Sequence, residues 1–180
     1  MDIERDRLEK FLREHATNVV DFLRVAVNNP SEFFKQAKDL LLPGNSEKMI
    51  VRPKIVLLHG SRNRQRILKP SVSSGGSNKN KNETLIYATN NPNYAIFLAV
   101  IDLQESGEAS VVVEDAVAHL SISKGFVNGE SRLASGYVHL VEGSSFQKLE
   151  NNEYASSNEV PVLFSIPVIP EDLTVSICVK

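Results

Sequence analysis

The sequence predicts an α+β protein with a mostly antiparallel, split β-sheet and an N-terminal pair of helices. Three observations predict this class: helical spacing of apolar residues in the first segment, one further helix start in the interior, and short β-type runs separated by turn residues after Gly44. The change of character at Gly44 divides the 180 residues into a helical element, residues 1–44, and a β-rich domain, residues 45–180.

The first predicted helical segment spans residues 3–28. Its apolar residues recur at helical spacing, at Leu8, Phe11, Leu12, Val19, Leu23 and Ala26. A second helix is predicted to begin at Asn29 and Pro30, because asparagine caps a helix and proline suits the first helical position. Pro43 and Gly44 predict its end. We expect this pair to form a structural hairpin or a partner surface without chemistry of its own.

The β-rich part begins with a continuous apolar run at residues 55–58, as expected of a strand buried on both faces. Residues 71–81 are almost all Ser, Gly, Asn and Lys and predict a loop. Asn91 and Pro92 repeat the cap-then-proline pattern and predict a helix as far as Val100. Pro161 predicts an edge strand or a late strand start. The strands are expected at residues 84–87, 110–114, 116–122, 137–141, 160–166 and 173–179.

Composition predicts a cytoplasmic protein without disulfide, metal or membrane chemistry. No apolar run approaches the roughly 20 residues that a membrane-spanning helix needs. The first fourteen residues are densely charged and contain no signal-peptide apolar stretch. Cys178 is the single cysteine, and no CxxC or HxxxH spacing suggests zinc. The glycosylation sequon at Asn82 is therefore expected to be a chance match.

Charge is distributed unevenly along the sequence, although the net charge is only −2. Between Glu47 and Glu83 there are nine basic residues and no acid, whereas residues 102–172 contain twelve acids and three bases. Such a split indicates that the basic region meets an anion, which could be a nucleotide, a nucleic acid or an acidic partner. The alternative is that these charges are solvated and pair across the fold.

Among the four histidines, His59 has the context of a binding residue. It follows a buried strand and is followed by Gly60, Ser61 and Arg62, and glycine at a strand end lets a ligand approach the backbone closely. His15 is expected at the surface or an interface of the first helix. His119 and His139 alternate with apolar residues, which is typical of histidines satisfied within a sheet.

Three motifs in the β-rich part resemble those of the diphtheria-toxin-like ADP-ribosyltransferases, the family that includes the poly-ADP-ribose polymerases. The run from Val56 to Arg62, followed by Ile67 and Leu68, resembles the first motif. A short strand ending at Tyr87, followed by Tyr94 in a helix, resembles the second, and Glu153-Tyr154 ahead of a late strand resembles the third. The resemblance covers residues 55–169 and implies an ADP-ribosyltransferase-like fold for residues 45–180.

This resemblance implies that NAD is bound as a substrate, and the lack of metal-ligand spacing predicts that no metal takes part. The backbone of Gly60 would hold the nicotinamide carboxamide, and His59 would donate a hydrogen bond to the adenosine ribose. Tyr87 and Tyr94 would stack on the nicotinamide. Ser61 and Arg62 complete the cofactor-binding set, with Arg62 facing the pyrophosphate. Glu153 would bond the nicotinamide ribose and stabilise positive charge as the glycosidic bond breaks, so the expected catalytic set is His59, Tyr87 and Glu153.

Two functions remain open from the sequence. The first is transfer of ADP-ribose from NAD to a protein or nucleic acid acceptor, with release of nicotinamide. The second is a non-catalytic interaction module whose basic residues 48–81 bind nucleic acid or an acidic partner. Within the first function Glu159 competes with Glu153 as the acid because it directly precedes a strand, and either acid could instead be a surface residue. Tyr87 and Tyr94 could also be core aromatics.

Overall fold

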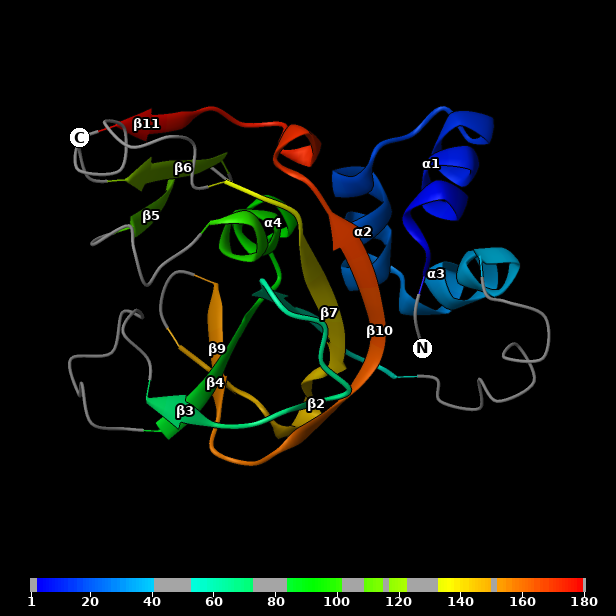
Figure 1. Ribbon diagram of the computed structural model, residues 1–180. Coiled ribbons are helices and arrows are strands. Elements are labelled where there is room, and N and C mark those ends of the chain that lie inside the picture. The colour runs from blue at the N-terminus through cyan, green and yellow to red at the C-terminus, as the bar shows by residue number, and fades with distance from the viewer. Residues whose placement is uncertain are drawn as a thin grey trace.

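The computed structural model describes residues 3–40, 53–72, 84–101, 109–114, 117–122, 133–149 and 152–179. Helices and a mostly antiparallel sheet share one body, as predicted for the α+β class (Figure 1). The larger sheet has eight strands, with seven in the order β2-β10-β7-β1-β4-β9-β8 and β3 paired to β4. A three-stranded sheet has the order β11-β6-β5, and its β11–β6 pair is parallel. None of the helices in the described ranges has the length and apolar character that crossing a bilayer requires.

The eight strands of the larger sheet have these bounds: β1 Val56–Ser61, β2 Ile67–Leu68, β3 Ser71–Val72, β4 Thr84–Thr89, β7 Gly136–Glu142, β8 Gln147–Lys148, β9 Glu153–Ser156 and β10 Val160–Val168. The smaller sheet contains β5 Ala109–Glu114, β6 Val117–Ile122 and β11 Ile177–Val179. Strands β2, β3, β8 and β9 were not predicted, and all four have only two to four residues. The last predicted strand, residues 173–179, is shorter than expected: β11 begins only at Ile177, after a 3-10 turn, η5 Pro170–Asp172, and four residues outside regular structure.

The N-terminal element contains three helices, so the predicted pair was wrong. Residues 3–28 form α1 Arg5–Glu14 and α2 Val19–Asn28, which are separated at Ala16, where φ is 49°. The next helix, α3 Pro30–Ala37, begins as predicted, since the Asn29 side chain accepts a hydrogen bond from the Glu32 amide. A 3-10 turn, η1 Lys38–Leu40, follows it, and the predicted stop at Pro43 and Gly44 lies outside the described residues.

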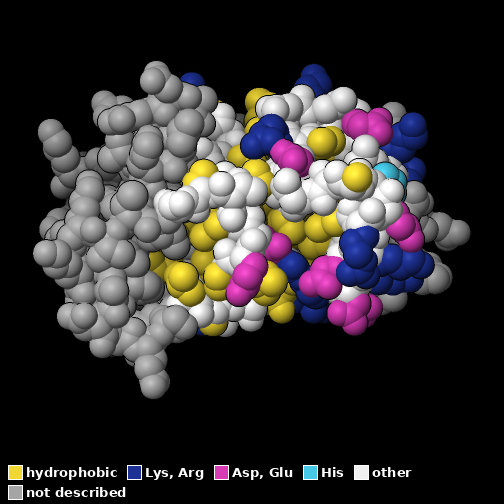
Figure 2. Space-filling model, turned by 90° about the horizontal axis from the view of Figure 1, so that it is seen from above, with side chains coloured by type: hydrophobic (Ala, Val, Ile, Leu, Met, Phe, Trp, Pro, Cys, Tyr) yellow, Lys and Arg dark blue, Asp and Glu magenta, His cyan; other side chains and the backbone are white. Residues whose placement is uncertain are grey.

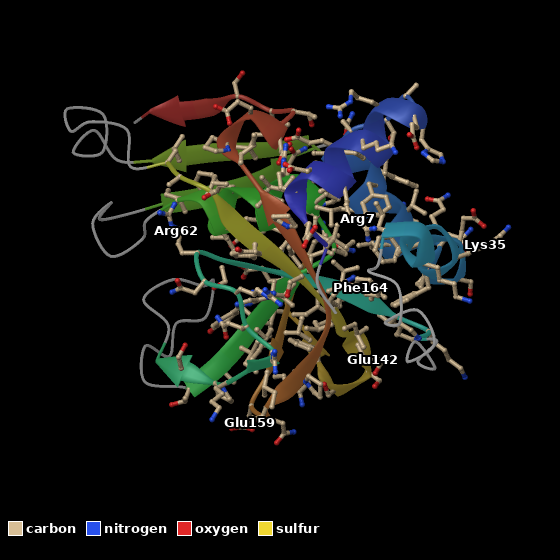
Figure 3. The ribbon with its side chains drawn as sticks, turned by 45° about the vertical axis from the view of Figure 1, so that its right-hand side comes forward. Arg7, Lys35, Arg62, Glu142, Glu159 and Phe164 are labelled. Carbon is tan, nitrogen blue, oxygen red and sulfur yellow. The ribbon has the colours of Figure 1, made fainter. Side chains whose placement is uncertain are left out.

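The core lies on both faces of the larger sheet. On one face, α1, α2, α3 and the interior helix α4 Pro92–Val100 pack against β1, β7 and β10 through one cluster that includes Val56, Leu58 and Phe164. Figure 3 shows Phe164 on β10 between the sheet and the N-terminal helices. On the other face, Leu57, Ile86 and neighbouring residues form a second, smaller cluster.

Strand β10 is the last long strand on its side of the sheet, with only the two-residue strand β2 beyond it. Pro161 is paired with Ile67 of the two-residue strand β2, and pairing of β10 with β7 begins only at Val162. A bulge between Val162 and Phe164 follows. Proline is therefore accommodated by the late start that the sequence offered as the second possibility.

The segment predicted as a loop, residues 71–81, begins with a short strand. Ser71 and Val72 form β3 and pair with Leu85 and Thr84, whereas residues 73–83 lie outside the described part. The interior helix begins as predicted, because the Asn91 side chain accepts from the Tyr94 amide and Pro92 occupies the first turn.

Candidate active site

Gly60 lies within strand β1 and not in a turn after it. The strand continues to Ser61, and its ladder with β7 sets His59 opposite His139 and Gly60 opposite Val138. Because side chains alternate along a strand, Leu58 and Gly60 face the helices, and Leu57 and His59 face the opposite side.

Because glycine has no side chain, Gly60 allows α4 to pack closely against β1. A Cβ built on Gly60 would lie 2.1 Å from the Ala95 carbonyl oxygen and 2.8 Å from the Ala99 amide nitrogen. Gly136 of β7 has the same relation to α4, with a built Cβ 2.0 Å from the Ala99 carbonyl oxygen. The two glycines thus allow the helix backbone to lie directly on the sheet, which is a different reason for glycine from the ligand approach expected from the sequence.

The ladder between β1 and β4 stops beside Gly60. The two strands are paired at Leu58 and Thr89. If that antiparallel register is continued by two residues, Gly60 lies opposite Tyr87. In place of a backbone pair at that point, the His59 side chain reaches across, and its Nδ1 donates to the Tyr87 carbonyl oxygen at 2.7 Å. The sheet is therefore split between the first two predicted motifs, with one imidazole bridging the split.

The protonation of His59 follows from this bond. Burial lowers the pKa of His59, and the bond to the Tyr87 carbonyl opposes this shift only in part, so the neutral ring is favoured. With the proton on Nδ1, Nε2 carries a lone pair, and it has no hydrogen-bond partner in the part of the chain that the structure describes. Toward a ligand, His59 thus offers an acceptor for a hydroxyl and not the donor that the resemblance implied.

Glu153 is the first residue of β9 and is buried beside α4. Strand β9 pairs with β4, which sets Glu153 opposite Thr89 and Ala155 opposite Tyr87. The Tyr94 hydroxyl donates to Glu153 Oε1 at 2.8 Å, and only 7% of Glu153 is exposed. Burial, followed by the charge of Glu153 and the bond to it, raises the pKa of Tyr94 far above its ordinary value, so this phenol stays protonated.

Of the two candidate acids, the geometry favours Glu153. The Glu159 carboxylate is 59% exposed and lies 3.6 Å from the Lys69 ammonium. Figure 3 shows Glu159 at the bottom of the view, at the turn before β10, and well below Arg62. The structure therefore brings Glu153, and not Glu159, to the strand that carries Tyr87.

Ser61 and Arg62 have partners of their own in the structure. The Arg62 Nη1 donates to the Val100 carbonyl oxygen at 2.9 Å, so this guanidinium caps the last turn of α4. The Ser61 hydroxyl accepts from the Asn63 amide and from the Gln65 side chain, at 3.2 and 3.1 Å. Both residues thus shape the segment that leaves β1. Arg64 and Arg66, farther along that segment, are exposed.

Sequence reasoning missed a buried polar cluster next to His59. His139 Nε2 donates to the Asn63 carbonyl oxygen at 3.1 Å, and the Ser165 hydroxyl lies 2.9 Å from His139 Nδ1, the remaining acceptor. His139 and Ser165 are 0% and 2% exposed, so this serine–histidine pair joins strands and has no access to a substrate. The rings of His59, His139 and Tyr137 stack in series with 6.2 Å between successive centroids. His139 is thus a satisfied sheet histidine, as the alternation predicted.

The other predicted features can be placed only in part. His15 is exposed, with its ring stacked on Phe11 at 4.0 Å between centroids. The side chains of His119 and Cys178 lie outside those that the structure describes. In the described ranges, no three His, Cys, Asp or Glu side chains are grouped as metal ligands would be.

Comparison with known proteins adds no assignment. No protein-family model, no curated protein and no solved structure matched this chain.

Proposed function

We propose that this protein is an NAD-dependent ADP-ribosyltransferase that transfers ADP-ribose to a protein or nucleic acid acceptor and releases nicotinamide. The observation that carries the proposal is the split between β1 and β4, with Gly60 opposite Tyr87 and the buried Glu153 on the next strand. Residues about 95 positions apart along the sequence meet on three adjacent strands.

Each part of this arrangement suits a step of the transfer. The edge of β1 at Gly60, which has no ladder partner in β4, offers backbone groups for an amide such as the nicotinamide carboxamide. His59 lies on the sheet face opposite Glu153, and at the split its acceptor nitrogen can accept a hydrogen bond from a ribose hydroxyl. The Glu153 carboxylate can stabilise the positive charge that develops on the ribose.

The reaction balances without a further reactant. The bond between the ribose C1′ and the nicotinamide nitrogen breaks, and its electron pair neutralises the pyridinium ring as nicotinamide leaves. A nucleophile of the acceptor then bonds C1′ and loses a proton to solvent or to a base. Water in the place of the acceptor yields free ADP-ribose.

The test is nicotinamide release from NAD by the purified full chain, with two matched variants. Glu153→Gln should lower the rate by at least about 100-fold, because it removes the charge that stabilises the transition state. Glu159→Gln alters an exposed acid and should leave the rate within about twofold. Equal effects of the two variants, or a wild-type protein that neither releases nicotinamide nor gains thermal stability with NAD, would contradict the proposal.

If the protein neither binds nor cleaves NAD, but binds nucleic acid with an affinity that falls steeply as the salt concentration rises, it is an interaction module instead. In that case Arg64→Ala and Arg66→Ala should flatten the salt dependence, since both side chains are exposed on the segment after β1.

A further inference from the structure

Five polar residues join β4, α4 and β9 through a set of hydrogen bonds. The Asn91 amide donates to Thr89 Oγ1 at 3.0 Å, and the Asn91 side chain accepts from the Tyr94 amide at 3.2 Å. The Tyr94 hydroxyl donates to Glu153 Oε1, and the Thr89 hydroxyl donates to the Asn152 carbonyl oxygen at 3.0 Å. The first turn of α4 is thereby tied to the residue before the acid and to the acid itself.

We propose that Tyr94 is the positioning residue of Glu153, and that it acts through its hydroxyl and not as a stacking platform for nicotinamide. This inference rests on the proposed function, because it assigns Tyr94 a role in presenting the proposed catalytic carboxylate. It replaces the role that the resemblance implied for this ring.

The backbone of Glu153 is already fixed by its neighbours. Its carbonyl oxygen accepts from the Leu149 amide at 2.8 Å, and it is paired with Thr89 across the ladder. The preceding residue, Asn152, has a φ of 61°, which is a left-handed conformation. Its carbonyl oxygen accepts a hydrogen bond from the Thr89 hydroxyl. What the backbone leaves adjustable is the rotation of the side chain, and the bond from Tyr94 to Oε1 restricts that rotation.

A protonated phenol is suited to this task. The bond is charge-assisted, because the acceptor is a carboxylate, and it lies where Tyr94 is half-buried and Glu153 is buried. Burial and the adjacent negative charge raise the pKa of Tyr94, so the hydroxyl remains a donor throughout the physiological range.

Tyr94→Phe separates the two roles, since phenylalanine keeps the ring and removes only the donor. The positioning role predicts that kcat for nicotinamide release falls by about 10- to 100-fold, while KM for NAD stays within about threefold. A stacking platform would keep its kcat in this variant. Wild-type kcat in Tyr94→Phe overturns the proposal.

The matched control is Tyr154→Phe. Tyr154 directly follows the acid, but its ring packs in the cluster on the opposite face of the sheet, against Ile86 and its neighbours. This variant should keep both kcat and KM. A loss in Tyr154→Phe as large as that in Tyr94→Phe would show a general effect on β9 and would overturn the assignment.

A second measurement separates failure of this inference from failure of the proposed function. If the wild type releases no nicotinamide, the proposed function fails. A double-mutant cycle of Tyr94→Phe and Glu153→Gln, measured by urea unfolding, then decides whether the Tyr94 hydroxyl holds the Glu153 carboxylate. A shift of the unfolding midpoint in the double variant smaller than the sum of the two single shifts supports the positioning bond. Additive shifts overturn it.

Discussion

At the scale of single residues, His139 makes the stability of the fold depend on pH. Its burial, opposed by the bond to Asn63 and reinforced by the neighbouring His59 and Arg64, lowers the pKa of His139 to about 4. The unfolded chain, with an ordinary histidine, binds a proton near pH 6.5, whereas the folded chain does not until about pH 4. The contribution of His139 to the free energy of unfolding is therefore fully present above pH 6.5. It is lost as the pH falls from 6.5 to about 4, by roughly 3 kcal/mol in total.

Urea unfolding between pH 7.5 and 4 measures this loss. His139→Gln keeps an amide donor for the Asn63 carbonyl but cannot titrate, so its free energy of unfolding should fall less steeply over the same range. Parallel pH profiles for the wild type and the variant would show that His139 does not carry the effect.

The sequence proposed which residues form the site but not how they contact one another. His59, Tyr87 and Glu153 were selected by their local context, and the structure places them on adjacent strands. The bond from Tyr94 to Glu153 was not predicted, since the two residues are 59 positions apart and the sequence does not say which end of a tyrosine meets a site. The tautomer of His59 likewise depends on the Tyr87 carbonyl, which only the folded sheet brings near.

At the scale of elements, the approach of α4 to the sheet depends on the two glycines beneath it. Gly60→Ala should destabilise the fold by more than about 2 kcal/mol, because the new methyl would meet helix backbone that cannot rotate away. Gly143→Ala is the comparison: its built Cβ lies 2.6 Å from the side chain of the exposed Ile55 and 3.1 Å from that of the buried Leu57, so it meets side chains and not helix backbone and should cost less. Chemical unfolding of both variants gives the comparison, and equal losses would contradict the account of α4.

Local signals predicted the elements that local chemistry determines. The caps at Asn29 and Asn91 were predicted correctly because each asparagine bonds an amide three residues ahead. The break between α1 and α2 was missed because it falls at Ala16, a residue that rarely adopts positive φ. Strand β9 was missed because its four residues are defined by pairing with β4 and β8, a contact that periodicity does not record.

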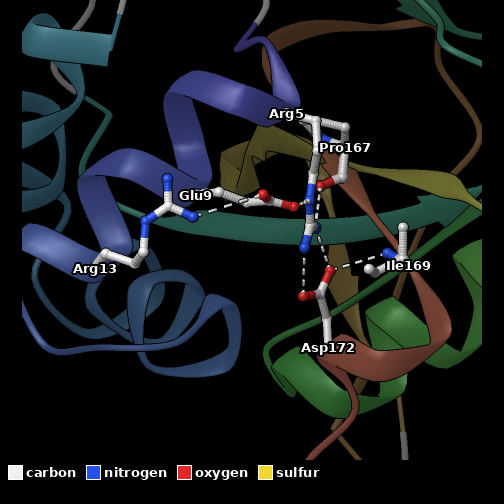
Figure 4. A network of polar contacts seen from close by, with 6 residues as sticks. All are labelled: Arg5, Glu9, Arg13, Pro167, Ile169 and Asp172. Carbon is white, nitrogen blue, oxygen red and sulfur yellow. Dashed lines mark hydrogen bonds and ion pairs between the residues drawn. The ribbon is translucent and has the colours of Figure 1, made fainter.

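At the scale of the whole molecule, one ion pair fastens the N-terminal helices to the C-terminal part. Arg5 donates from Nη1 and Nη2 to the two carboxylate oxygens of Asp172, at 2.5 and 3.0 Å, and Nε donates to Glu9 (Figure 4). Asp172 also accepts from the Ile169 amide. Burial alone would lower the pKa of Arg5, but the bonds to Asp172 and Glu9 outweigh it and raise the pKa.

Arg5→Ala should therefore lower the free energy of unfolding by about 1–3 kcal/mol, because it leaves a partly buried carboxylate without its bidentate partner. Lys10→Ala is the matched control on the same helix, since Lys10 and Glu14 are 3.8 Å apart and largely exposed, and it should change stability by less than about 0.5 kcal/mol. Figure 2 shows basic and acidic side chains interspersed over the described part of this face, most densely at one end. Urea unfolding gives the free energy of unfolding of both variants. A loss in Lys10→Ala equal to that in Arg5→Ala would contradict a stabilising role of the Arg5–Asp172 ion pair.

The contact of Phe33 and Phe34 with Phe164 has a consequence for biosynthesis. Both rings lie in the first fifth of the sequence and meet Phe164, in its last tenth, with centroids 5.8 and 5.5 Å apart. The amphipathic helices consequently leave the ribosome well before the strand that covers them, and their aromatic faces stay exposed until that strand has been synthesised. We expect chaperones that hold nascent chains to engage this segment first, and a stalled chain lacking Phe164 to aggregate through it.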